Sequence, residues 1–279
     1  MTLTSLTILG DYGLGDLAFL EVLQRLQLEL PSFQFQTLSV PALNTLGTGF
    51  ALAQLALNPG LAGRLYYHNC DPRKDKATAL LDNEGGQLTY ALLPNDVRVV
   101  GVLSGYTLSF LKHEAKALHY LNIRKAGSQF RSRDLFPLAL SAIARGDYSL
   151  LGAEIDLDLI PDVPEDLIAW VDGYGNLKTT IKAQSLRLEP GTKLTVNIGD
   201  VLAEATYTNS VFSVPEGTLA LAPGSSGWLS ADGTQLTWME LFLRGGSAYE
   251  LFGKPKIAQT ISNLKAKMHA TPLLELHTA

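Results

Sequence analysis

One segment, Gly127–Gly146 (GSQFRSRDLFPLALSAIARG), brings side chains of different chemistry close together in the sequence. Phe130, Arg131, Ser132 and Asp134 stand just before an apolar run with helical spacing, and Ser132 or Asp134 is expected to cap that helix. An aromatic ring, a cation and a hydroxyl at a helix N-terminus suit a polar ligand. The alternative is a pair of surface arginines in front of a core helix.

Two aspartates follow predicted buried strands. Asp11 comes after the apolar run at residues 3–9, and Asp71 follows a second run at residues 65–70. Alternating strands and helices predict a mostly parallel sheet flanked by helices, with ligand groups at the carboxyl ends of the strands. Asp11 and Asp71 are therefore expected at one edge of the sheet. Between them we expect a helix, a strand and a helix, at residues 14–30, 33–40 and 44–57.

Charged residues surround both aspartates. Asp71 opens the run DPRKDK, which includes Arg73, and a carboxylate beside cations stays ionised and can orient a water molecule or a ribose. The alternative for this run is a solvated loop. Asp16, in the glycine-flanked segment GDYGLGD, either accepts a hydrogen bond from a ribose hydroxyl or caps the following helix.

The sequence pattern changes after a linker at residues 156–166 (DLDLIPDVPED), which is acidic and contains two prolines. We predict an α/β domain over residues 1–160 and an all-β domain, a small barrel, over residues 161–279. Short apolar runs separated by glycine-rich turns support the second assignment. In one turn, Asp172–Asn176, Tyr174 can stack on a base and Asn176 can pair with an adenine edge. The alternative is an ordinary β-turn.

Composition excludes several classes of function. The net charge is −5 and there is no run of Lys or Arg, so no nucleic-acid partner is expected. No apolar run reaches the roughly 18 residues of a membrane helix and no secretory signal is visible, so we expect a cytoplasmic protein with no membrane partner. The single cysteine, Cys70, fits a reducing compartment. No histidine has metal-ligand spacing, and no metal is expected.

Several segments, in order along the chain, resemble the S-adenosylmethionine hydroxide adenosyltransferases and the related fluorinases and chlorinases. LTILGDYGLGD resembles the family's LLTDFGxxD, and CDP at residues 70–72 resembles the start of VDPGVG. SQFRSRDLF is similar to STFHGRDIF, and WVDGYGNLKTTI to IDxFGNxxTNI. GSSGW at residues 224–228 and MELFLRGGSAYELFG at residues 239–253 resemble two further C-terminal segments.

The resemblance implies an N-terminal α/β domain, a C-terminal β-barrel and a homotrimer whose site lies between neighbouring subunits. The implied reaction is displacement of methionine from the ribose C5′ of S-adenosylmethionine, by hydroxide to give adenosine or by halide to give a halonucleoside. It uses S-adenosylmethionine as substrate and needs no cofactor and no metal. Because the sulfonium is already a good leaving group, catalysis is mostly positioning of the nucleophile.

The family's substrate-binding positions carry over residue by residue. The resemblance places Asp11 near the ribose, Phe130 near the reacting centre, Asp172 on the methionine amino group and Asn176 on adenine. Two further positions match a serine and an adenine-contacting residue of the family, Ser226 and Ala248.

The catalytic set of the hydrolases, Asp–Arg–His, is altered. Asp71 stands at the aspartate position, Arg73 is a candidate for the arginine, and Arg131 replaces the histidine. Arginine stays protonated and cannot act as a general base, although it attracts hydroxide or halide. Ser132 stands where a fluorinase has a serine. Three hypotheses remain: a divergent hydrolase, an adenosyl-binding protein without catalysis, and a halogenase, which nothing else in the sequence supports.

Overall fold

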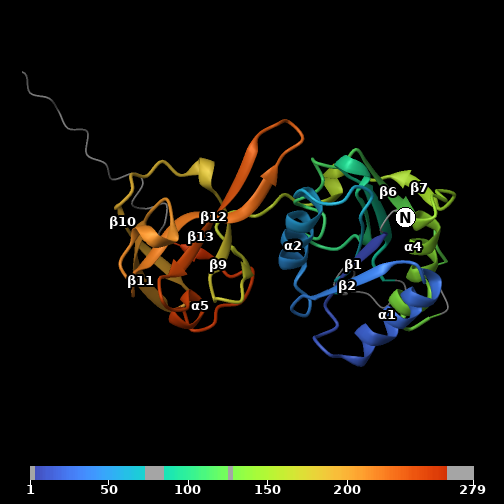
Figure 1. Cartoon of the computed structure of the whole chain (residues 1–279), viewed down its shortest axis with the longest axis horizontal. Helices are drawn as coiled ribbons and strands as arrows, with labels where there is room; N and C mark the ends of the chain where they lie inside the picture. Colours follow the sequence, from blue (N-terminus) through green and yellow to red (C-terminus); the bar gives the residue numbers. More distant parts are fainter. Residues whose placement is uncertain (1–3, 73–84, 125–127, 263–279) are drawn as a thin grey trace, which may run out of the picture. The chain divides into compact units, whose positions relative to one another are not determined.

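The computed structural model describes residues 4–72, 85–124 and 128–262 (Figure 1). The chain forms two compact units, Met1–Val163 with Leu229–Thr234 and Pro164–Trp228 with Gln235–Ala279. Each unit is built on one mixed seven-stranded sheet. No helix in the described part of the chain is both long and apolar enough to cross a membrane.

The N-terminal sheet has the strand order β2-β1-β3-β5-β4-β6-β7. Strands β2, β1, β3 and β5 are parallel, as the alternation of strands and helices predicts for the first three of them. Strands β4, β6 and β7 pair in antiparallel fashion, so the sheet is mixed and not mostly parallel as expected. The strands are β1 (Ser5–Gly10), β2 (Gln34–Ser39), β3 (Leu65–Asn69), β4 (Leu88–Leu92), β5 (Arg98–Val102), β6 (Ala117–Leu121) and β7 (Leu151–Glu154).

The change of direction has a local cause. Strand β4 connects to β5 through residues 93–97, where the 3-10 turn η1 (Pro94–Asp96) reverses the chain and Leu93 N–H donates to Val97 O at 2.8 Å. A connection this short makes a hairpin, because a parallel pair needs a crossover of a dozen residues or more.

Helices cover both faces of this sheet (Figure 1). Helix α1 (Leu17–Glu29) and helix α4 (Phe136–Ala144) pack on one face, where Leu26 and Leu140 join a core with Tyr67 of β3. Helix α2 (Thr45–Leu57) follows β2 and leads back to β3, so right-handed crossovers place it on the opposite face. The short helix α3 (Arg131–Asp134) precedes α4.

Arginines from elsewhere in the unit bind the carboxyl ends of the three longer helices. Arg145 donates to Glu29 O of α1 at 3.1 Å, and Arg98 donates to Ile143 O of α4 at 2.8 Å. Arg64 donates to three carbonyl oxygens at the end of α2, between 2.9 and 3.4 Å. None of these helices has a basic residue in its own last turn, so the arginines satisfy carbonyls that the helices leave free.

The C-terminal unit is an almost closed sheet with the order β14-β10-β11-β12-β13-β9-β8. Its two end strands meet through backbone bonds, since Ile168 N–H donates to Gln259 O at 3.0 Å and Ile261 N–H to Asp166 O at 2.7 Å. The expected all-β barrel fits in this coarser sense. The elements are β8 (Ile168–Val171), β9 (Leu177–Lys182), β10 (Lys193–Ile198), β11 (Val201–Tyr207), β12 (Leu219–Leu229), β13 (Gln235–Leu243), α5 (Ala248–Leu251) and β14 (Ile261–Ser262).

Candidate active site

Asp11 lies at the carboxyl end of β1, beside the end of β3. Its N–H donates to Asn69 O at 3.2 Å, and its Oδ2 accepts a hydrogen bond from Leu43 N at 3.1 Å. Burial raises the pKa of the Asp11 carboxyl above its ordinary value, and the negative charge of Asp71 adds to the rise. Asp11 and Asp71 therefore share one electrostatic environment, which also contains the buried thiol of Cys70.

Asp71 and Arg131 meet at the dipeptide Gly85–Gly86. Gly86 N–H donates to Asp71 Oδ2 at 3.0 Å, while Arg131 Nη1 donates to Gly86 O at 3.3 Å. A Cβ atom on Gly85 would lie 2.9 Å from Arg131 Nη1 and 3.4 Å from Asp71 Oδ2. A Cβ on Gly86 would lie 2.4 Å from Val102 Cγ1. The absence of side chains at both positions lets the carboxylate and the guanidinium approach the same stretch of backbone.

Phe130 forms part of the apolar wall beside these charges. Its ring makes an edge contact with Tyr12, with centroids 6.1 Å apart, and the Arg133 guanidinium lies over it at 5.0 Å. Ser132, one residue beyond Arg131, is buried. Arg131 itself lies over the ring of Phe136, 5.2 Å from its centroid.

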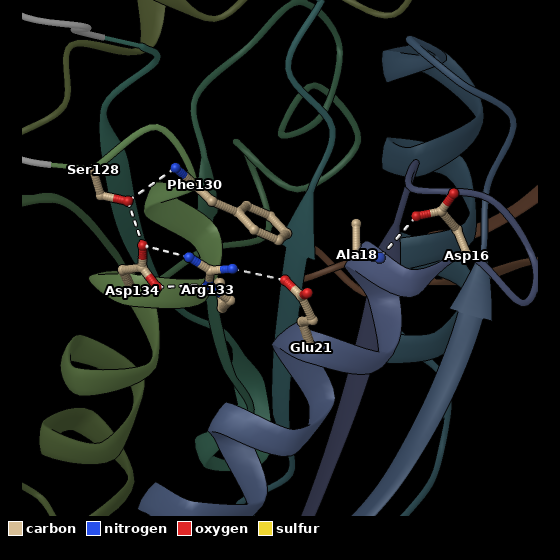
Figure 2. A network of polar contacts seen from close by, with 7 residues as sticks. All are labelled: Asp16, Ala18, Glu21, Ser128, Phe130, Arg133 and Asp134. Carbon is tan, nitrogen blue, oxygen red and sulfur yellow. Dashed lines mark hydrogen bonds and ion pairs between the residues drawn. The ribbon is translucent and has the colours of Figure 1, made fainter.

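Figure 2 shows that the other charged groups of this segment form a structural network. Arg133 pairs with Asp134 through Nε at 2.7 Å and Nη2 at 3.1 Å, and with Glu21 of α1 through Nη1 at 2.7 Å. Ser128 Oγ donates to Asp134 and accepts from the N–H of Phe130. The expectation that Ser132 or Asp134 caps the long helix is wrong, because α4 begins at Phe136 with no side-chain cap.

Asp16 and Arg73 are the two remaining predicted residues of the N-terminal unit. Asp16 caps α1, accepting a hydrogen bond from Ala18 N at 2.8 Å, which is the structural one of the two roles considered for it (Figure 2). Arg73 lies outside the described residues.

Asp172 organises the turn between β8 and β9. Its Oδ1 accepts from Tyr174 N at 2.9 Å and from Asn176 N at 3.0 Å, and its Oδ2 accepts from Asn176 Nδ2 at 3.0 Å. Tyr174 is 84% exposed, so its ring is available for contact with a ligand. These three bonds do not use the carboxamide oxygen of Asn176.

Lys178 joins this turn to two other strands of the C-terminal unit. Its Nζ lies 3.2 Å from Glu240 Oε2 on β13, 3.3 Å from Ser225 Oγ on β12, and 3.9 Å from Asp172 Oδ2. The Lys178 and Glu240 side chains are only 14% and 11% exposed. Ser226, beside this cluster, is buried.

Ala248 lies beside the same turn. Tyr249 N–H donates to Gly175 O at 2.8 Å, which ties the first turn of α5 to the turn of Asp172. Gly175 has φ +78°, and a Cβ atom there would fall 2.0 Å from Ser247 Oγ, so only glycine fits this contact. The structure thus brings Asp172, Asn176 and Ala248 together within the unit.

Four residues of these clusters are not predicted by the sequence patterns. Gly85–Gly86 is recognisable only as a glycine pair, and nothing local indicates that it lies against Asp71 and Arg131. Lys178 and Glu240 lie 62 positions apart, and their pairing depends on β9 and β13 being neighbours. Among the described residues, no three His, Cys, Asp or Glu side chains gather closely enough to hold a metal ion.

Comparison with known proteins finds similar structures. No protein-family model and no curated protein matches the chain. An uncharacterized conserved protein from Thermotoga maritima has a TM-score of 0.71 and 17% identity, over 92% of this chain and 99% of that one. A conserved hypothetical protein from Thermus thermophilus has a TM-score of 0.61 and 22% identity, over 93% of this chain and 99% of that one. At these identities the likeness establishes a shared fold.

Proposed function

We propose that this protein binds S-adenosylmethionine and hydrolyses it to adenosine and methionine. The observation that carries the proposal is the approach of Asp71 and Arg131 to the same dipeptide, Gly85–Gly86, with Asp11 beside Asp71. A carboxylate next to a permanent cation suits the positioning of a water molecule for attack on a sulfonium substrate. The sequence resemblance supplies the identity of that substrate.

Each group has a role that its chemistry permits. The oxygen of water attacks C5′ as the C5′–S bond breaks, and methionine leaves with the bonding electron pair. The proton of that water passes to the Asp71 carboxylate, since Arg131 stays protonated and serves only to stabilise negative charge. Asp11 is assigned to a ribose hydroxyl. The resemblance assigns the Asp172–Asn176 turn of a neighbouring subunit to the adenine and the amino group of methionine.

The direct test is incubation of the purified protein with S-adenosylmethionine, followed by chromatography for adenosine and methionine. Asp71→Asn and Arg131→Met are expected to lower kcat at least tenfold, as loss of a positioned acid–base or electrostatic group does. The exposed Arg187→Met is the matched control, because it removes an arginine far from these contacts in the sequence. Equal amounts of adenosine from active and heat-inactivated protein would refute the hydrolase.

A second candidate is an adenosyl-binding protein without catalysis. Arg131 at the position of the family's histidine favours it, since the guanidinium cannot accept a proton. Calorimetry with adenosine and S-adenosylmethionine separates the two: heat of binding without turnover selects the binding protein, and the absence of heat with either compound contradicts both. A halogenase remains the third candidate and requires consumption of substrate that depends on halide.

A further inference from the structure

The thiol of Cys70 lies beside Asp11 at the carboxyl ends of two neighbouring parallel strands. Gly10 of β1 and Asn69 of β3 are register partners, and Asp11 N–H donates to Asn69 O at 3.2 Å. Asp11 and Cys70 are thus the next residues along the two strands. Cys70 has no exposed surface, and its side chain is hydrogen-bonded to the Asp11 carboxyl. The single thiol of the chain therefore contacts a group that is assigned to the substrate.

The thiol supplies the proton of this hydrogen bond. Burial raises the pKa of Cys70 to about 12, and the negative charge of Asp11 adds to the rise, so the thiol is protonated at neutral pH. The hydroxyl of Thr48 is also hydrogen-bonded to the thiol, and it donates its own proton to Asn44 O at 2.8 Å. Of the two oxygens beside the thiol, the carboxylate is the stronger acceptor, because its charge strengthens the hydrogen bond. The thiol proton is therefore directed at Asp11.

Asp11 depends on such donors because it is partly buried. Burial raises the pKa of its carboxyl, and the hydrogen bonds from Leu43 N–H and from Cys70 oppose that rise. Leu43 N donates to Asp11 Oδ2 at 3.1 Å from a left-handed conformation with φ +62°, which is uncommon for a residue other than glycine. One donor thus precedes α2 and the other follows β3. Together they hold both the charge and the orientation of the carboxylate.

We propose that Cys70 is a positioning residue, whose thiol donates a hydrogen bond to Asp11 and directs the free lone pairs of that carboxylate toward a ribose hydroxyl. A carboxylate only accepts hydrogen bonds, so a hydroxyl donor on the ligand suits it. The family motif VDPGVG has valine where this chain has Cys70, so the resemblance does not supply this donor. The inference deepens the proposed function and rests on it for the ribose contact, whereas the hydrogen bond itself requires no ligand.

Infrared spectroscopy of the full chain measures the hydrogen bond directly, because one cysteine gives one S–H stretching band. Donation to a carboxylate lowers the frequency of this band. Asp11→Asn, which replaces the charge with a neutral amide, is expected to raise the frequency, and Thr48→Val should change it less. Equal bands in the wild type and Asp11→Asn, or a larger rise in Thr48→Val, would overturn the proposal. Acidification of the wild type should also raise the frequency as Asp11 binds a proton, and a band that does not move would contradict the hydrogen bond.

Calorimetry with adenosine tests the positioning role. Cys70→Ala removes the donor, whereas Cys70→Ser keeps a donor in a side chain of similar size. Cys70→Ala is expected to weaken binding about tenfold, as loss of a hydrogen bond to a charged group does. The affinity should also begin to fall at a higher pH, because Asp11 loses a donor that keeps it ionised.

Cys70→Ser should restore both the affinity and its pH dependence, which a purely structural role of the thiol would not explain. An alanine variant that binds like the wild type, or a serine variant as weak as the alanine variant, overturns the positioning role. A wild-type protein with no affinity for adenosine refutes the proposed function instead. The infrared comparison then decides by itself whether the thiol holds Asp11.

Discussion

Replacing His68 with leucine is expected to remove a large part of the acid sensitivity of the fold. His68 lies in β3 with no exposed surface, and neither ring nitrogen has a hydrogen-bond partner among the described residues. Its ring fills the space over Gly101 of β5, where a Cβ atom would lie 2.0 Å from Nε2. Because charging this ring in an apolar interior is unfavourable, burial lowers the pKa of His68 to about 4.

The size of the effect follows from the two protonation states. The unfolded chain binds the His68 proton near its ordinary pKa of 6.5, whereas the folded chain binds it only near pH 4. As the pH falls through this window, protons bind preferentially to the unfolded chain and the free energy of unfolding decreases. At ~1.4 kcal/mol per pH unit, the wild-type protein loses about 2 kcal/mol between pH 6.5 and 5 through this group alone. At pH values well above 6.5, His68 does not lower the free energy of unfolding.

Urea denaturation at a series of pH values between about 8 and 4.5 measures this loss. The free energy of unfolding should fall less with decreasing pH in His68→Leu than in the wild type. At pH ~5 the loss is expected to be smaller by about 2 kcal/mol. His119→Leu is the matched control, since it removes a histidine of β6 and keeps His68. Carboxyls such as that of Asp11 are present in all three proteins and cancel in the comparison. Parallel curves for wild type and His68→Leu would show that His68 is not held neutral.

Four further predictions test the packing and the charges. Gly101→Ala is expected to cost about 1–3 kcal/mol by overpacking, and a second change, His68→Ala, should recover most of it; simple additivity in denaturation would refute the contact. Arg64→Met leaves carbonyls at the end of α2 without a donor and should cost about 2 kcal/mol, whereas a loss below about 0.5 kcal/mol would contradict that role. Lys178→Met leaves a mostly buried glutamate unpaired and should cost about 3 kcal/mol in urea denaturation; an unchanged midpoint would mean that the pair contributes little. Glu21→Gln removes the exposed ion pair with Arg133 and should leave the urea midpoint unchanged. A clear fall of the midpoint would show that this surface pair stabilises the fold.

The parallel part of the N-terminal sheet is predictable because its signals are local. Strands and helices alternate from β1 to β3, and this order places the carboxyl ends of β1 and β3 together. The proximity of Asp11 and Asp71 follows from that arrangement. The antiparallel half is not predictable in the same way, because the direction of β4 depends on the short link to β5. Sequence periodicity reports where a strand lies but not how it pairs.

The side-chain partners within the candidate site are less predictable. The sequence allows Asp16 as a helix cap and Asp172 as part of a β-turn, because the partners of both lie within four positions. Arg131 and Gly86 are 45 positions apart, and no local pattern connects them. The same holds for His68 and Gly101, whose contact exists only because β3 and β5 are adjacent.

The arginines at the helix ends tie the secondary structure of the N-terminal unit to its tertiary assembly. The arginines that donate to the last carbonyl oxygens of α1, α2 and α4 lie between 6 and 116 positions away from those carbonyls in the sequence. Excised peptides covering α1 or α4 would lack the guanidinium that closes the final turn. Helix completion and docking onto the sheet are thus one event, which favours all-or-none unfolding of this unit.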